Sequence, residues 1–396
     1  MGVYKQIINK NFIIMLISLI LAGTAQMAVN TNVAGYCTGV LGISQAQYGT
    51  IVAVAGIVVV VAYPFIGILC DKMRHGICGA IGGVLLAAGF LLYLVSGSFV
   101  SVMLTRCVQF LGFGFILNAC LSVAAMAKPQ YRSAAMTLYG LGPALSYFTG
   151  PQTGTAIYTN FGYSAMFLAS AVMAIVCGVV FLFCTSKPAV NPDAPKKKAF
   201  GFEKTAIPGF ILSFLVLQIV FIAQSYATLS LLERGISQAA LFWTVGAVIN
   251  IIARLFMTSL IEKVGINNMF YITVVLLVIA VLCIALSTNL ALVLVAAACW
   301  GIGYNGAQAS IMSVSVLRAP AERVGQANST HQMGHNAAQI VWSQIAGILI
   351  GVIGYQGMFL CMIIPIIAGV VFYVVYVRKI VNKVMAERKA AAQISE

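Results

Sequence analysis

Long apolar stretches dominate this chain and limit what it can fold into. Twelve runs of mostly apolar residues are separated by charges or by clusters of glycine, proline and asparagine. A helix of about 20 such residues crosses the hydrocarbon core of a bilayer, whereas transmembrane strands show short alternating segments. We expect an all-α membrane protein with twelve transmembrane helices, near 12–34, 47–69, 77–96, 99–121, 134–156, 163–184, 207–231, 239–260, 268–287, 290–316, 326–352 and 357–377.

The composition also indicates a membrane protein. Of the 396 residues, 61% are hydrophobic and 8% are charged, whereas a soluble domain carries about 25% charged residues. The ten cysteines are scattered singly, mostly inside apolar runs. We therefore interpret them as small hydrophobic side chains and predict neither a disulfide framework nor a metal site.

The basic residues lie on one side of the predicted membrane. Of the 22 lysines and arginines, 19 precede the first span or follow an even-numbered span. Basic loops stay in the cytoplasm. We expect a multi-pass protein of the cytoplasmic membrane with both termini inside the cell. This topology explains the net charge of +14, so no nucleic-acid partner is expected.

The two halves of the chain carry the same landmarks in the same order. The Gly-Ile-Ser-Gln-Ala segment at 42–46 recurs at 235–239, and Gly-Tyr at 162–163 recurs at 354–355. Because each half holds six spans, the halves share one orientation and form parallel repeats. The predicted domains are an N-terminal six-helix bundle (1–184), a cytoplasmic linker (185–206), a C-terminal six-helix bundle (207–378) and a cytoplasmic tail (379–396).

The loop after the second span resembles the signature loop of the major facilitator superfamily, Gly-x-x-x-Asp-(Arg/Lys)-x-(Gly/Arg). Residues 67–76 read GILCDKMRHG. The resemblance covers essentially the whole chain and implies two six-helix bundles around a solute pathway. It also implies that this loop acts as a latch for one access state, through Gly67, Asp71, Lys72 and Arg74.

The corresponding loop of the second half is degenerate. Glu262 and Lys263 match the acidic and basic positions, but Thr258 stands where the family has glycine. We expect a weaker latch in this half.

Two further motifs resemble those of the family. Arg106 and Gln109 match its Arg-x-x-Gln motif, although Phe110 replaces the expected glycine. Residues 150–154, with Gly150, Pro151 and Gly154, resemble the Gly-Pro-x-x-Gly motif of the antiporter and drug-efflux branch. The segment predicts a bent, closely packed helix, and it favours export. A generic kinked helix is the alternative interpretation.

Charged and titratable residues inside the spans need a reason to be there. A charge at membrane depth costs roughly 2.5–3.5 kcal/mol. Arg106 is either a substrate or coupling residue or pairs with helix-end carbonyls, and Arg254 either binds an anion or joins the Glu262 loop. His331 and His335 share one helix face. They contact a proton or the substrate, or pack as neutral groups, and no third ligand supports a metal there.

The polar residues of the pathway suggest the kind of solute. In the family the first, fourth, seventh and tenth spans line the pathway. No Asp or Glu lies deep within any predicted span, so an anionic or neutral polar solute suits this chain better than an organic cation. The predicted lining residues are Gln26, Asn30, Gln109, Asn118, Gln218, Gln224, Tyr226, Asn305 and Gln308.

These observations together predict a secondary transporter that moves a small organic solute by alternating access, with export or exchange favoured. The alternative is proton-coupled uptake of an organic acid, with His335 carrying the proton. An enzyme is disfavoured because no nucleophile–base set is evident, and a channel because no filter motif is present. The expected partners are the solute, the lipid bilayer and either protons or a counter-transported solute. We expect a monomer without a cofactor.

Overall fold

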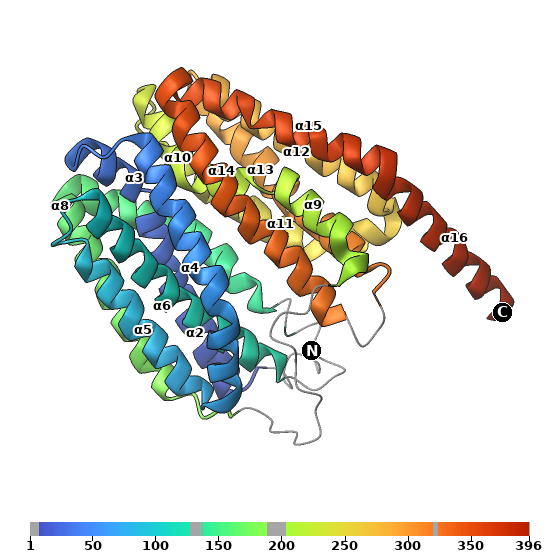
Figure 1. The fold of residues 1–396 in the computed structure, drawn as a ribbon, viewed down its shortest axis with the longest axis horizontal. Helices are drawn as coiled ribbons and strands as arrows, with labels where there is room; N and C mark the ends of the chain where they lie inside the picture. The colour runs from blue at the N-terminus through green and yellow to red at the C-terminus, as the bar shows by residue number, and fades with distance from the viewer. Residues whose placement is uncertain (1–7, 127–134, 136–137, 188–202, 320–323, 396) are drawn as a thin grey trace. The chain divides into compact units, whose positions relative to one another are not determined.

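The computed structural model describes residues 8–126, 135, 138–187, 203–319 and 324–395, which form helices and no strand (Figure 1). The chain divides into two compact units, Met1–Lys197 and Lys198–Glu396. Most of the predicted linker, at 188–202, lies outside the described residues.

The described helices of the first unit follow the predicted spans. Two of their N-termini are fixed by local side chains: Ser44 and Ser98 each form a capping box, with the serine side chain accepting from the backbone three residues on. The first span runs further than predicted, because a helical turn and a π-helix continue it to Val40. The elements are α2 (Lys10–Asn30), α3 (Val33–Gly35), η1 (Tyr36–Val40), α4 (Gln45–Lys72), α5 (His75–Leu92), α6 (Phe99–Ala125) and α8 (Leu141–Leu182).

Helix α2 packs along α8, and this contact is unusually close. A Cβ atom added at Gly154 would meet the backbone of Ala28, and one at Gly150 would lie 2.8 Å from the Thr24 carbonyl oxygen. The Gly-Pro-x-x-Gly segment therefore lets two backbones approach each other. The helical backbone continues through Pro151. In the rest of the unit, α5 packs on α6 and α8, and α4 packs on α6.

The described part of the second unit begins with a short turn at Lys204 and ends in a long helix. The predicted tail at 379–396 is helical as far as Ser395 and continues directly from the preceding element (Figure 1). The core of the unit is α13, which packs on α9, α11 and α12, while α9 also packs on α14. The elements are η3 (Lys204–Ala206), α9 (Ile207–Val216), α10 (Ile219–Glu233), α11 (Leu241–Val264), α12 (Ile266–Leu286), α13 (Leu290–Val316), α14 (Val324–Cys361), α15 (Ile363–Phe372), η5 (Tyr373–Val377) and α16 (Arg378–Ser395).

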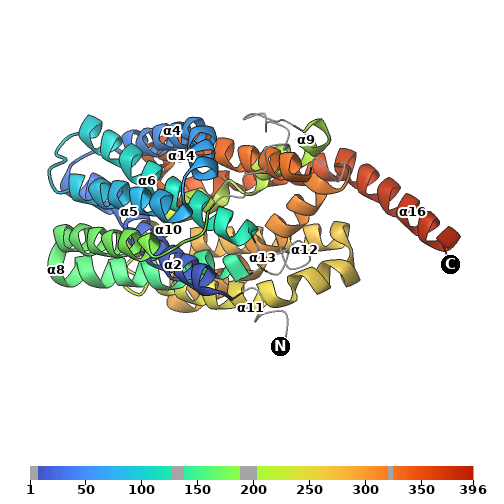
Figure 2. The same ribbon diagram turned by 90° about the horizontal axis from the view of Figure 1, so that it is seen from below.

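The two units have glycine turns at equivalent positions. Gly42 and Gly235 have φ angles of 66° and 77°, and Gly162 and Gly354 have φ angles of 85° and 70°. Left-handed backbone of this kind is adopted mainly by glycine. Both pairs are repeat-related positions, so the sequence repeat extends to backbone conformation. Figure 2 shows α8 as two arms, one above the other, on either side of Gly162.

Helix length and composition support a membrane fold. Nine helical segments among the described residues are long and apolar enough to cross a bilayer. Two of them, Leu141–Leu182 and Ser329–Glu387, contain the breaks at Gly162 and Gly354, and a shorter apolar segment covers Leu241–Arg254. The predicted all-α membrane fold is confirmed, and the number of twelve crossings stays a prediction.

Candidate functional site

Four of the predicted polar residues of the first unit are joined in one buried network. Arg106 on α6 is 2% exposed. Its Nη1 donates to Gln109 Oε1 at 3.0 Å and to the Tyr93 hydroxyl at 3.5 Å. Gln109 Nε2 donates in turn to Gln26 Oε1 on α2 at 2.9 Å, and Gln26 Nε2 donates to Asn30 Oδ1 at 3.5 Å. We call Gln26, Asn30, Tyr93, Arg106 and Gln109 the arginine network.

Helix geometry explains why these residues meet. Arg106 and Gln109 are three apart on α6, and Gln26 and Asn30 are four apart on α2, so each pair shares one face of its helix. The contact between α2 and α6 brings the two pairs together through Gln109 and Gln26. The resulting polar chain connects two of the four spans that line the pathway in the family.

Aromatic rings surround the guanidinium group. Arg106 Cζ lies 4.8 Å from the centroid of the Phe110 ring, which is a cation–π distance. Tyr93 stacks on Phe167 with ring centroids 4.7 Å apart, and its hydroxyl donates to Gln109 Oε1 at 2.9 Å. The Tyr36 hydroxyl donates to the Tyr93 carbonyl oxygen at 3.3 Å. Phe110 and Tyr93 thus contact a guanidinium group whose side chain is 2% exposed.

The described partners of Arg106 leave its charge unbalanced. Gln109 and Tyr93 are neutral, and Arg106 Nε is buried without a hydrogen-bond partner among the described residues. Helix-end carbonyls, the structural alternative, are not among these partners. A buried guanidinium with a free donor and no described counter-charge is suited to binding an anionic or polar group.

The other predicted residues of this unit lie apart from the network. Asn118 donates to the Gly114 carbonyl oxygen of its own helix at 2.9 Å. No described atom lies within 4 Å of a Cβ atom added at Gly67, so Gly67 makes no close helix contact among the described residues. Lys72 is exposed, and the Asp71 side chain lies outside the described part.

Arg74 connects the latch loop to another helix. Its Nη2 donates to the carbonyl oxygen of Leu182, the last residue of α8, at 2.7 Å. A cation at a helix C-terminus interacts favourably with the helix dipole. This contact gives Arg74 a defined structural partner in the first unit.

Replacing Arg74 by alanine is expected to lower the free energy of unfolding by about 1 kcal/mol, because a partly exposed charge contact at a helix end contributes little more. Thermal unfolding of the purified variant would measure this loss. Lys72→Ala is the matched control, since Lys72 is exposed, and its unfolding temperature should equal that of wild type. Equal loss in both variants would contradict a specific role of Arg74.

In the second unit Arg254 meets an asparagine of the tenth predicted span. Arg254 Nη2 donates to Asn305 Oδ1 on α13 at 3.4 Å, and Asn305 Nδ2 donates to the Asn250 carbonyl oxygen at 2.7 Å. Arg254 is half-buried and Asn305 is buried. Lys263 is exposed, and the Glu262 side chain lies outside the described part, so the Glu262 interpretation of Arg254 stays untested.

The two histidines are buried on α14 against α9 and α10. His331 Nδ1 lies 2.7 Å from Ser213 Oγ. The His335 ring centroid lies 4.6 Å from that of Phe221, and its Nδ1 has no hydrogen-bond partner among the described residues. Where side chains are described, no group of three or more His, Cys, Asp or Glu residues is placed to hold a metal.

Gln218 lies where two helices are interrupted. It lies with Leu217 between α9 and α10, and its Nε2 donates at 3.0 Å to the carbonyl oxygen of Met362, which separates α14 from α15. Gln218 Oε1 is buried without a described partner. The remaining predicted lining residues are not joined to it: Tyr226 is buried against Tyr355, and Gln224 and Gln308 are half-buried.

Sequence reasoning missed three residues that complete these contacts, namely Tyr93, Ser213 and Asn250. Tyr93 lies at the end of α5 and reaches Arg106 only because α5 packs on α6. Ser213 and the carbonyl oxygen of Asn250 likewise form hydrogen bonds to residues of a neighbouring helix. No motif marks them, although a tyrosine or serine at the end or middle of an apolar run is a weak signal of a buried polar partner.

Curated relatives resemble only part of the chain. The synaptic vesicular amine transporter of Mus musculus is 26% identical over 157 residues, which are 38% of this chain and 29% of that protein. The human chromaffin granule amine transporter is 26% identical over 161 residues, or 40% of this chain and 31% of that protein. The matched segment thus spans about a third or less of the length of these relatives.

Solved transporter structures share the fold over nearly the whole chain. The nucleoside transporter NupG superposes with a TM-score of 0.75 at 14% identity, over 92% of this chain and 99% of that one. The peptide transporter POT in complex with sulfate gives 0.74 at 16% identity, over 93% and 94% of the two chains. The family model of the Major Facilitator Superfamily matches residues 15–343. Since this match covers most of the sequence, the chain belongs to the Major Facilitator Superfamily.

Proposed function

We propose that this chain is a secondary transporter of a small organic solute, anionic or polar, that works by alternating access in the cytoplasmic membrane with both termini inside. Family membership supports a transporter rather than an enzyme. The resemblance of residues 150–154 to the Gly-Pro-x-x-Gly motif supports export or exchange as the direction.

One observation carries the choice of solute, namely the unbalanced charge of Arg106. A buried ion without a partner is costly, and the arginine network supplies only neutral partners among the described residues. A carboxylate or phosphate of the solute would accept a charge-assisted hydrogen bond from the free Nε. The binding of that group would recover part of the free energy that burial of the guanidinium costs.

The amine transporters among the relatives suggest a cationic solute, but the described side chains favour an anion. Among the described side chains, the buried acidic residue is Glu203, which is 4% exposed. Its Oε1 accepts hydrogen bonds from the backbone N–H and the hydroxyl of Thr205 at 3.1 and 2.9 Å. Glu203 therefore caps η3, and the arginine network holds no described carboxylate for an amine.

A ligand screen on the purified full-length protein tests this proposal. Mono- and dicarboxylates, phosphate esters and organic amines would be added separately while thermal unfolding is followed. We expect stabilisation by members of the acidic set and by none of the amines. Counterflow into proteoliposomes loaded with the stabilising compound would then show whether it is transported. Stabilisation by amines alone would contradict the anionic assignment.

Proton-coupled uptake of an organic acid is the second candidate function. It is favoured by one observation, the buried Nδ1 of His335 without a described partner, since histidine is the side chain that titrates near neutral pH. Against it, the described neighbours of the two histidines are Ser213 and Phe221, which carry no charge.

We therefore expect solute exchange in proteoliposomes to change less than twofold when a pH gradient is imposed, because no described counter-charge helps either imidazole to carry a proton. His335→Gln keeps a polar group of similar size and should retain gradient-independent exchange. Exchange that accelerates several-fold with the gradient in wild type, and loses this response in His335→Gln, would establish proton coupling instead.

A further inference from the structure

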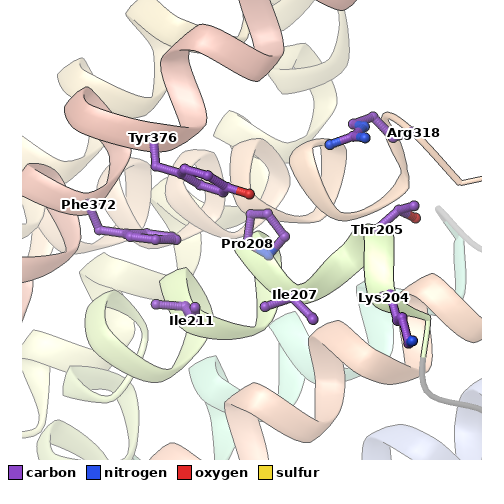
Figure 3. Close-up of a pocket in the computed structure, with 8 residues that line it drawn as sticks. All are labelled: Lys204, Thr205, Ile207, Pro208, Ile211, Arg318, Phe372 and Tyr376. Atoms are coloured by element: carbon purple, nitrogen blue, oxygen red, sulfur yellow. The ribbon is translucent and has the colours of Figure 1, made fainter.

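A separate cavity lies in the second unit, at the end of its helices that carries the basic residues. Its volume is about 270 Å³. It is bounded by η3 and the first turns of α9, by Arg318 two residues after the end of α13, and by α15 with η5 (Figure 3). The side chains that matter here are Lys204, Thr205, Ile211, Arg318, Phe372 and Tyr376.

The two ends of this cavity differ in chemistry. Figure 3 shows Lys204, Thr205 and Arg318 together at one end, with the Tyr376 hydroxyl pointing toward them. Phe372 and Ile211 form the opposite end. A cavity with two cations at one end and apolar side chains at the other fits a molecule that is itself anionic at one end and apolar at the other.

The polar end has donors for an anion. Lys204 and Arg318 are exposed, so both charges are available to a ligand. The nearest acidic residue in sequence, Glu203, is buried and is occupied by the backbone N–H and hydroxyl of Thr205. The Thr205 hydroxyl thus donates inside the protein, and the donors left for a ligand are Lys204, Arg318 and the Tyr376 hydroxyl.

The apolar end continues onto an exposed apolar surface. Val371 and Val375 beside Phe372 are 55% and 60% exposed, and Ile207 is 37% exposed. In a protein that spans a bilayer, exposed apolar side chains of this kind face acyl chains. Lys204 begins η3 and Arg318 follows the end of α13, so we expect the polar end of the cavity to lie at the level of the lipid headgroups.

We propose that this cavity binds an anionic phospholipid, with the phosphate held by Lys204, Arg318 and the Tyr376 hydroxyl. The acyl part lies against Phe372 and Ile211. Arginine forms strong charge-assisted hydrogen bonds with phosphate, and basic clusters at a membrane surface select anionic lipids. The same phosphate chemistry is present in soluble phosphate, so the test must separate the two sources.

The test measures thermal unfolding and lipid binding of the full-length protein in mild detergent. Phosphatidylglycerol is titrated against phosphatidylcholine and against inorganic phosphate. We expect stabilisation by phosphatidylglycerol, little by phosphatidylcholine and none by inorganic phosphate. The double variant Lys204→Gln with Arg318→Gln loses the contribution of two basic residues near the membrane surface. It should therefore bind phosphatidylglycerol about 30-fold more weakly.

Two further variants make this result decisive. Arg378→Gln with Lys379→Gln removes two exposed charges beyond the residues that line the cavity, and should bind phosphatidylglycerol like wild type. Lys204→Arg with Arg318→Lys keeps both charges and should retain binding. Equal losses in the two glutamine variants, or equal stabilisation by inorganic phosphate, would overturn the assignment of a lipid to this cavity.

Discussion

Replacing Arg106 by glutamine is expected to weaken ligand binding strongly while the ligand-free protein stays at least as stable as wild type. Removing a buried charge that has only neutral described partners relieves a cost of roughly 2.5–3.5 kcal/mol. The Tyr93 hydroxyl still donates to Gln109 Oε1, so the remaining network keeps its partners. Loss of one member of a buried charge pair costs about 2–5 kcal/mol, so the affinity for an anionic solute should fall on the order of 100-fold.

Thermal unfolding with and without the stabilising ligand, followed by counterflow, measures both effects. Arg234→Gln is the matched control in the other unit. Arg234 Nη1 donates to the carbonyl oxygens of Ile284, at 3.3 Å, and Ala285 at the end of α12. This variant should lose stability and keep the ligand response. A variant of Arg106 that unfolds early but still responds to ligand would show that Arg106 is structural.

The second large effect is expected at Gly154. An added Cβ there would overlap the Ala28 carbonyl oxygen and lie 2.7 Å from the Ala28 Cα. Both are backbone atoms that cannot rotate away, so α2 and α8 would have to separate. Overpacking of this kind costs about 1–3 kcal/mol, so Gly154→Ala should be clearly destabilised. Gly154→Leu should prevent folding of the first unit.

Gly67→Ala is the matched control for this prediction. No atom lies within 4 Å of the added Cβ at Gly67, and alanine is preferred to glycine in a helix by about 0.5–1 kcal/mol. Gly67→Ala should therefore be as stable as wild type or slightly more so. Size-exclusion profiles and unfolding temperatures of the two alanine variants would show whether Gly154→Ala is less stable than Gly67→Ala. Equal unfolding temperatures would contradict the close contact of α2 and α8.

Much of the fold is predictable from this sequence because the membrane imposes it. Apolar runs must become helices when no water is available to the backbone, and the repeated glycines mark the turns. The sequence is less informative where packing decides the outcome. Glu203 falls in the predicted linker, and nothing in the sequence indicates that it is buried or that its N–H donates to Thr330 Oγ1 on α14 at 3.0 Å.

Part of the site was predictable from the spacing of polar residues along the helices. The spacing of Arg106 and Gln109, and of Gln26 and Asn30, places each pair on one helix face, and the helix contact then joins them. Tyr93 completes the network through a contact between neighbouring helices that no periodicity encodes. The role of these residues in binding stays a prediction until ligand measurements are made.

The turns at Gly162 and Gly354 have a mechanical consequence. Each joins two long apolar arms through one residue with left-handed backbone, φ 85° and 70°, without an intervening loop. A connection of one residue holds the ends of the two arms together, so neither arm can slide lengthwise along the other. We therefore expect each hairpin to travel as one rigid piece during the transport cycle, with the bending confined to other places in the chain.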